Sequence, residues 1–149
     1  MRIEEQFRVK SPVQRVWDFM SDLERFGPCI PGCTSVVRVD DKSYKMTVKQ
    51  KVGPVSVSFE LNTVVTRTDP PVLLEAFGRG KDPRIASGVD QRITMKLVPA
   101  EAETDVVVGL DVTMSGVLGT LGQGVIKAKV KQMAEEVAAA VRAQVEAGG

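Results

Sequence analysis

Hydrophobic and polar residues alternate along most of this chain. In residues 2–9, Ile3, Phe7 and Val9 fall on one face and charged or polar residues fall on the other. Successive side chains of a strand point to opposite faces, so this period of two predicts a half-buried β-strand. The chain therefore opens with a strand that contributes one face to a core.

A change to helical spacing follows this strand. Ser11, Pro12 and Gln14 predict a capping box, with Ser11 as the side-chain acceptor, proline at the first helical position and glutamine three residues after the cap. A further turn, capped by Asp22, is expected to carry Phe26 before a Gly-Pro pair stops it. We therefore predict two short helices directly after the first strand.

From Ser35 onwards the period of two returns. Turn residues divide this region into a short strand followed by five longer strand patterns at residues 44–52, 55–65, 72–80, 85–98 and 104–115. The turns between them are short, which favours antiparallel pairing. Together with the first strand, they predict a seven-stranded antiparallel sheet.

The last part of the chain predicts a long amphipathic helix. Apolar residues recur there at steps of three, four or five, at Leu118, Leu121, Val125, Val130, Met133, Val137, Val141 and Val145. A curved antiparallel sheet needs a cover on its apolar face, and this helix is long enough to provide one. We predict an α+β helix-grip fold in which residues 1–149 form a single domain.

Composition narrows the compartment and the partners. The chain has 149 residues, is 43% hydrophobic, and has 20 basic against 19 acidic residues. The near balance of charge gives no field that would attract nucleic acid, and no apolar run is long enough to span a bilayer. Without a signal pattern at the start, the expected compartment is the cytoplasm, with at most peripheral contact at the inner face of the membrane.

The absence of histidine argues against most catalytic and metal sites. Histidine is the commonest general base and a common zinc ligand, and this chain has none. It has a single tyrosine, Tyr44, and no motif that pairs a nucleophile with a base. We predict no catalytic residue, no metal site and a protein that is not an enzyme.

Cys29 and Cys33 flank the loop residues Ile30, Pro31 and Gly32. With no histidine and no third cysteine, a zinc site is not expected, whereas a disulfide and a redox pair stay open. We favour a loop shaped by Pro31 and Gly32, in which both thiols pack and Ile30 docks at the mouth of a cavity.

The predicted fold leaves room for an apolar cavity between sheet and helix. An empty cavity of about 300 Å³ would cost about 7 kcal/mol at roughly 24 cal/mol per Å³, which a lipophilic guest would relieve. The alternative is that side chains fill the space. The candidate lining residues are Trp17, Phe26, Ile30, Phe59, Phe77, Met95, Met114, Leu118 and Leu121.

Two amides fall in register with inward-facing apolar residues. Gln50 and Gln91 are therefore candidates to bind a polar group of the guest, although bonds to backbone or water are the simpler expectation. Glu5 has a similar position, for which an edge strand is the simpler explanation. Lys127, Lys129 and Lys131 are expected to form a solvated helix face rather than a docking patch.

Several motifs together resemble a known family. They are the Ser11-Pro12 helix start, Val16-Trp17, the loop Cys29-Ile30-Pro31-Gly32-Cys33, and Ser115-Gly116-Val117-Leu118-Gly119-Thr120-Leu121-Gly122 before the last helix. In this order they resemble the carbon monoxide dehydrogenase CoxG-like family of the START-like, pollen-allergen-like SRPBCC superfamily. The resemblance covers nearly the whole chain and implies the same helix-grip fold.

The resemblance also implies a role. Members of the family accompany molybdenum hydroxylases of the carbon monoxide dehydrogenase type, and are linked to membrane attachment and to handling of a lipophilic electron carrier such as a quinone. It thus implies an accessory protein with a bound quinone or lipid and no intrinsic cofactor. The alternatives are an assembly or membrane-recruitment protein without a ligand and, third, a helix-grip enzyme such as a cyclase.

Overall fold

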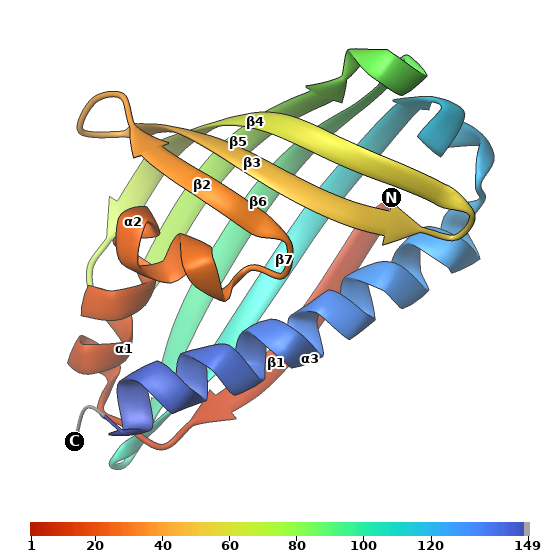
Figure 1. Ribbon diagram of the computed structural model, residues 1–149. Helices are drawn as coiled ribbons and strands as arrows, with labels where there is room; N and C mark the ends of the chain where they lie inside the picture. The colour runs from red at the N-terminus through yellow and green to blue at the C-terminus, as the bar shows by residue number, and fades with distance from the viewer. Residues whose placement is uncertain (148–149) are drawn as a thin grey trace.

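The computed structural model describes residues 1–147 as a curved seven-stranded antiparallel sheet that wraps around one long helix (Figure 1). The strands are β1 (Arg2–Val9), β2 (Cys33–Arg38), β3 (Ser43–Val52), β4 (Val55–Asp69), β5 (Leu73–Asp82), β6 (Ser87–Ala100) and β7 (Glu103–Gly116). Their order is β1-β7-β6-β5-β4-β3-β2, so β1 and β2 are the edges. The predicted α+β helix-grip fold is confirmed.

The helices lie at two ends and across the middle of the sheet. They are α1 (Val13–Met20), α2 (Leu23–Phe26) and α3 (Gln123–Ala147), together with the short 3-10 turns η1 (Gly27–Cys29), η2 (Pro83–Ile85) and η3 (Val117–Thr120). In Figure 1, α3 runs diagonally across the sheet, while α1 and α2 gather near its C-terminal end. This arrangement places an interior between α3 and the concave face of the sheet.

The start of α1 differs from the predicted capping box. Pro12 occupies the N-cap position and no side chain accepts a capping hydrogen bond. Ser11 lies one residue too early, where its Oγ has no hydrogen-bond partner among residues 1–147. Its carbonyl instead accepts a 2.8 Å bond from Thr104 Oγ1. The prediction is therefore wrong at Ser11, although the helix itself forms.

Asp22 caps α2 as the sequence predicts. Its Oδ1 accepts a 3.1 Å hydrogen bond from the backbone N of Glu24. The side chain thereby satisfies one of the backbone donors that a helix start leaves unpaired.

The long helix begins later than its apolar stripe. Leu118 is fully buried in η3, before α3 starts at Gln123. Val125, predicted to face the core, is 40% exposed, and Ile126 takes the buried position instead. The break at Gly122, where φ is +82°, resets the helical phase and accounts for the difference.

Candidate functional site

Two separate groups of buried apolar side chains fill the two ends of the interior. The first, here called the α1 cluster, consists of Val9, Val16, Trp17, Phe19, Met20, Cys29, Met95, Leu97, Val106, Val141 and Val145. The second, the η3 cluster, consists of Ile3, Val52, Val57, Phe59, Val89, Val112, Leu118 and Ile126. The core is thus divided rather than continuous.

Between the clusters, the concave face carries small and polar residues. Cross-strand pairing places Thr63, Gly78 and Gln91 side by side on β4, β5 and β6. On β6 the inward residues Gln91 and Ile93 are only half-buried, whereas their neighbours in the same register at each end belong to the two clusters. Accessible space therefore adjoins this middle band, although β6 lies in the interior of the sheet.

Most of the predicted lining residues lie at the inner face, but in different clusters. Trp17 and Met95 belong to the α1 cluster, with Phe26 packed against it. Phe59 and Leu118 belong to the η3 cluster, with Met114 and Leu121 packed against it. Ile30 is half-buried after η1 and belongs to neither cluster. These residues therefore bound the two ends of the interior rather than one compact pocket.

The prediction for Phe77 is wrong, because this side chain lies on the convex face. Its neighbours across the sheet are the exposed residues Val64 and Arg92. The guanidinium carbons of Arg79 and Arg92 lie 5.7 and 5.5 Å from its ring centroid. The inward positions on either side of it hold Ala76 and Gly78, so the largest apolar residue of this part of β5 faces outward.

Gln50 is held by the protein itself. Its Nε2 donates a 2.6 Å hydrogen bond to the carbonyl of Pro31, in the loop between the two cysteines. A Cβ at Gly32, where φ is +80°, would lie 2.9 Å from the same nitrogen. Gln50 therefore fixes the loop, in agreement with the simpler expectation of a bond to backbone.

Gln91 makes no such bond within residues 1–147. An ideal Cβ at Gly78 would be 3.2 Å from its Nε2 and 3.5 Å from Thr63 Oγ1, so the amide lies over the glycine beside that hydroxyl. A buried or half-buried amide is favourable only when water or another polar group pairs with it. The middle band therefore presents an amide that can bond to an oxygen-bearing guest or to water.

The two cysteines are free thiols, so the disulfide alternative is excluded in this structure. Cys29 is buried, and desolvation raises the pKa of both thiols; a backbone hydrogen bond at Ser35 partly opposes the effect at Cys33. A raised pKa keeps thiols protonated and poorly nucleophilic at neutral pH. Their packing into the loop agrees with the favoured prediction.

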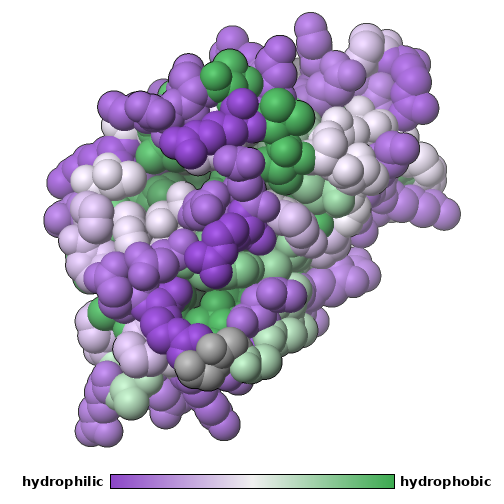
Figure 2. Space-filling view, turned by 60° about the vertical axis from the view of Figure 1, so that its left-hand side comes forward, coloured by the Kyte–Doolittle hydropathy of each residue, from purple (hydrophilic) through white to green (hydrophobic). Residues whose placement is uncertain are grey.

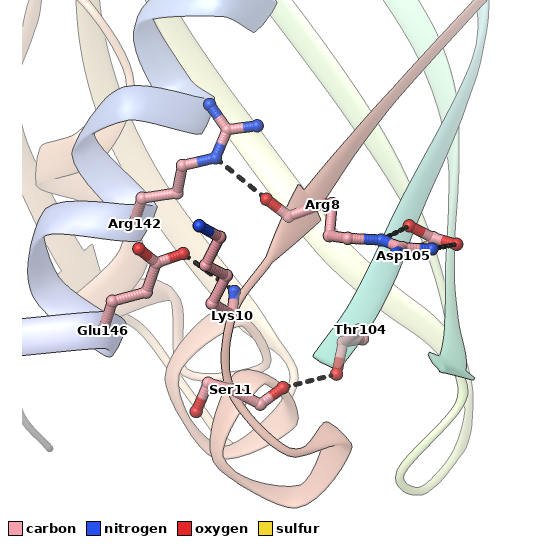
Figure 3. Close-up of polar contacts among 7 residues, drawn as sticks. All are labelled: Arg8, Lys10, Ser11, Thr104, Asp105, Arg142 and Glu146. Carbon is pink, nitrogen blue, oxygen red and sulfur yellow. Dashed lines mark hydrogen bonds and ion pairs between the residues drawn. The ribbon is translucent and has the colours of Figure 1, made fainter. Parts of the chain in front are cut away.

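Polar contacts fix the C-terminal end of α3 to β1 (Figure 3). Arg142 Nε donates to the carbonyl of Arg8 at 2.8 Å, and the backbone N of Lys10 donates to Glu146 Oε2 at 2.8 Å. Arg8 also forms a two-pronged ion pair with Asp105 on β7. The helix that borders the interior is thus anchored at the end near α1.

Asp82 joins the opposite end of the sheet and is not predicted from the sequence. Its carboxylate is 1% exposed and accepts hydrogen bonds from the Arg84 guanidinium and from the backbone N of Ser58. These bonds lower its pKa from 3.8 to about 2, the Arg84 bond contributing most. Asp-Pro signals a turn, but the bond to Ser58 depends on tertiary structure.

A hollow of about 750 Å³ lies along the β3–β4 hairpin. Its lining consists of Thr47, Lys49, Gln50, Lys51, Ser56, Val57, Ser58, Glu60, Asp82, Pro83, Arg84 and Lys129. This lining is mainly polar, unlike the predicted apolar cavity. Of the residues predicted to bind a ligand, Gln50 is the one that borders it within residues 1–147.

The surface carries no uniform apolar face in the view of Figure 2, where hydrophobic patches alternate with hydrophilic side chains. Within residues 1–147, no helix is both long and apolar enough to cross a membrane. The same residues contain no group of three or more cysteine or carboxylate side chains placed to hold a metal ion.

Comparison with known proteins gives a family and a fold. The carbon monoxide dehydrogenase family CoxG matches residues 6–146. No curated protein sequence matches the chain.

Three solved structures share the fold at low sequence identity. A conserved protein from Geobacillus kaustophilus is 18% identical with a TM-score of 0.89, over 98% of this chain and 95% of that one. A START superfamily protein from Mycobacterium smegmatis is 17% identical with a TM-score of 0.74, over 99% of each chain. The ZhuI aromatase/cyclase from Streptomyces sp. R1128 is 16% identical with a TM-score of 0.72, over 98% and 93%.

Proposed function

Because this chain belongs to the carbon monoxide dehydrogenase CoxG family, we propose that it is a non-catalytic accessory protein that holds a lipophilic ligand between its sheet and α3. The partner is a molybdenum hydroxylase of the carbon monoxide dehydrogenase type. The ligand is a quinone or another lipid-like molecule with at least one oxygen acceptor.

The observation that carries this proposal is the divided interior. Apolar clusters bound both ends, and between them Gln91 and Ile93 stay half-buried on the concave face of a central strand. Apolar walls with a few placed polar groups are typical of small-molecule sites. The Gln91 amide is suited to donate to a carbonyl oxygen of the guest.

The residue chemistry supports a role without catalysis. Some proteins of this fold are cyclases, such as the Streptomyces protein. This chain has no histidine, and burial raises the pKa of both of its thiols, so it offers neither the usual base nor a ready nucleophile. Binding and delivery need neither group.

A blocking variant tests the ligand. Ala134 is half-buried on the inner side of α3, whereas Ala139 on the same helix is exposed. The purified protein and the variants Ala134→Phe and Ala139→Phe are compared by native mass spectrometry and organic extraction. We expect a co-purifying quinone or lipid in the parent protein and in Ala139→Phe, and a loss of most of it in Ala134→Phe.

Equal occupancy in the two variants would contradict the interior site. Absence of any bound lipid, together with no thermal shift on addition of menadione or decylubiquinone, would contradict the ligand itself. Circular dichroism of both variants checks that the phenylalanine has not unfolded the protein.

A second candidate is recruitment of the same oxidoreductase without a ligand. It is favoured by the edge strand β2, where Val37 is 56% exposed and Val39, just after the strand, is 55% exposed. Apolar side chains on an open strand edge are typical of protein contacts. Under this function, Val37→Lys weakens binding to the partner enzyme, while Ala134→Phe leaves binding unchanged.

A further inference from the structure

The hollow along the β3–β4 hairpin collects cations from three separate elements. Lys49 and Lys51 come from β3, Arg84 from η2 and Lys129 from α3. Its volume of about 750 Å³ is in the range of small-molecule sites. A solvated helix face would explain Lys129 alone, but not its convergence with cations of η2 and β3.

Hydroxyl groups lie among these cations. Pairing of the two strands places Lys49 opposite Ser58 and Lys51 opposite Ser56. Thr47 lies opposite Glu60 at the far end of the same row. The hollow therefore offers ammonium and hydroxyl donors side by side along a two-stranded ribbon.

The carboxylates of the hollow leave an excess of positive charge. Asp82 already accepts from Arg84 and from the backbone N of Ser58. Glu60 is the second carboxylate in the lining, against three lysines. Within residues 1–147, none of these lysines forms a salt bridge. The position also has apolar surface nearby, since a Cβ at Gly53 in the hairpin turn would lie 3.4 Å from Val125.

We propose that this hollow binds the phosphate group of an anionic ligand. A phosphate group carries several oxygen acceptors and up to two negative charges, which several converging cations and hydroxyls satisfy better than a single carboxylate does. The concave shape favours a small group over the flat surface of an acidic protein. The phosphate belongs either to a phospholipid headgroup or to a soluble phosphate compound. This site is distinct from the interior site proposed above and does not depend on it.

Two probes separate the sources of phosphate. Binding of inorganic pyrophosphate is measured by isothermal titration calorimetry at low ionic strength. Binding to phosphatidylcholine vesicles, with and without an equal amount of phosphatidylglycerol, is measured by co-sedimentation. We expect saturable binding to pyrophosphate, to the phosphatidylglycerol vesicles, or to both.

A triple variant, Lys49→Gln with Lys51→Gln and Lys129→Gln, is expected to weaken that binding roughly tenfold or more, because it removes three charge-assisted contacts. The matched control is Lys42→Gln with Lys45→Gln and Lys96→Gln, three exposed lysines outside the hollow. It removes the same charge and is expected to change binding by less than about twofold.

Equal weakening in the two triple variants would show only a general charge effect and would overturn the site. Absence of binding to both probes would also overturn it. So would loss of binding of the first variant to an acidic partner protein alone, since the hollow would then be a protein contact. Because the substitutions are on exposed or half-exposed lysines, circular dichroism is expected to show an unchanged melting temperature.

Discussion

Single residues on β5 decide which face of the sheet has room for a guest. Gly78 faces inward and leaves the space that the Gln91 side chain occupies, whereas Phe77 faces outward under two arginines. Glycine inside a strand often marks such a close approach. Hydrophobicity alone predicts the reverse for these two positions, because it assigns the phenylalanine to the core.

The outward position of Phe77 gives the first prediction. Phe77→Leu removes two exposed cation–π contacts, each worth about 0.5–1 kcal/mol. We expect a destabilisation of about 1 kcal/mol in urea unfolding and unchanged lipid occupancy in native mass spectrometry. Loss of the lipid from a folded Phe77→Leu protein would place this side chain in the ligand site and contradict its outward position.

Asp82 gives a prediction on pH. Its folded-state pKa of about 2 is below the ordinary 3.8, so its ionised form stabilises the fold above pH 3.8. This contribution is lost as the pH falls from 3.8 to about 2, where the carboxyl becomes protonated in the folded protein too. Asp82→Asn is therefore expected to be less stable than the parent at neutral pH, with a difference that shrinks below pH 3.8.

Urea unfolding at a series of pH values measures that difference. Asp41→Asn is the matched control, because its side chain is fully exposed and its single ion pair is 3.5 Å long. A stability difference for Asp82→Asn that stays constant across the acid range would contradict the assignment to the ionised carboxylate.

At the scale of elements, the sequence predicts the strands and helices well and their phases less well. Periods of two and of helical spacing locate all seven strands and the three helices within a few residues. Proline at the N-cap displaces Ser11, and the turn at Gly122 shifts the buried face of α3 from Val125 to Ile126. Local backbone geometry sets these phases, and hydrophobicity does not encode it.

Two glycines at the start of α3 isolate that backbone effect. A Cβ would meet nothing within 4 Å at either Gly122 or Gly124, but Gly122 has φ of +82° and Gly124 lies inside the helix. Gly124→Ala is expected to stabilise the protein by roughly 0.5–1 kcal/mol, and Gly122→Ala to destabilise it by about 1 kcal/mol. Chemical denaturation measures both, and a stabilising Gly122→Ala would contradict the left-handed turn.

At the scale of the whole molecule, the fold combines packed ends with a less filled middle. The α1 and η3 clusters each hold a fully buried anchor, Val141 and Leu118 respectively. The sequence predicts an interior of this kind, and most of the proposed lining residues lie in or beside the clusters or in the middle band. It does not predict the division, because that depends on which strands bring Ala76, Gly78 and Gln91 together.

The division predicts that stability and binding respond in opposite ways to one substitution in the middle band. Gln91→Leu replaces an amide without a partner in residues 1–147 by an apolar side chain of similar size. The ligand-free protein is then expected to become more stable by roughly 1 kcal/mol, because no polar group has to be kept hydrated on the inner face. Lipid occupancy is expected to fall, because the guest loses its hydrogen-bond donor.

Leu118→Ala is the contrasting variant at a packed end. It opens a cavity in the η3 cluster and is expected to destabilise the ligand-free protein by about 2–5 kcal/mol. Urea unfolding of delipidated protein and native mass spectrometry of protein as purified measure the two responses. If Gln91→Leu lowered stability as well as occupancy, the amide would be part of the packed structure, and the middle band would not be a site kept open for a ligand.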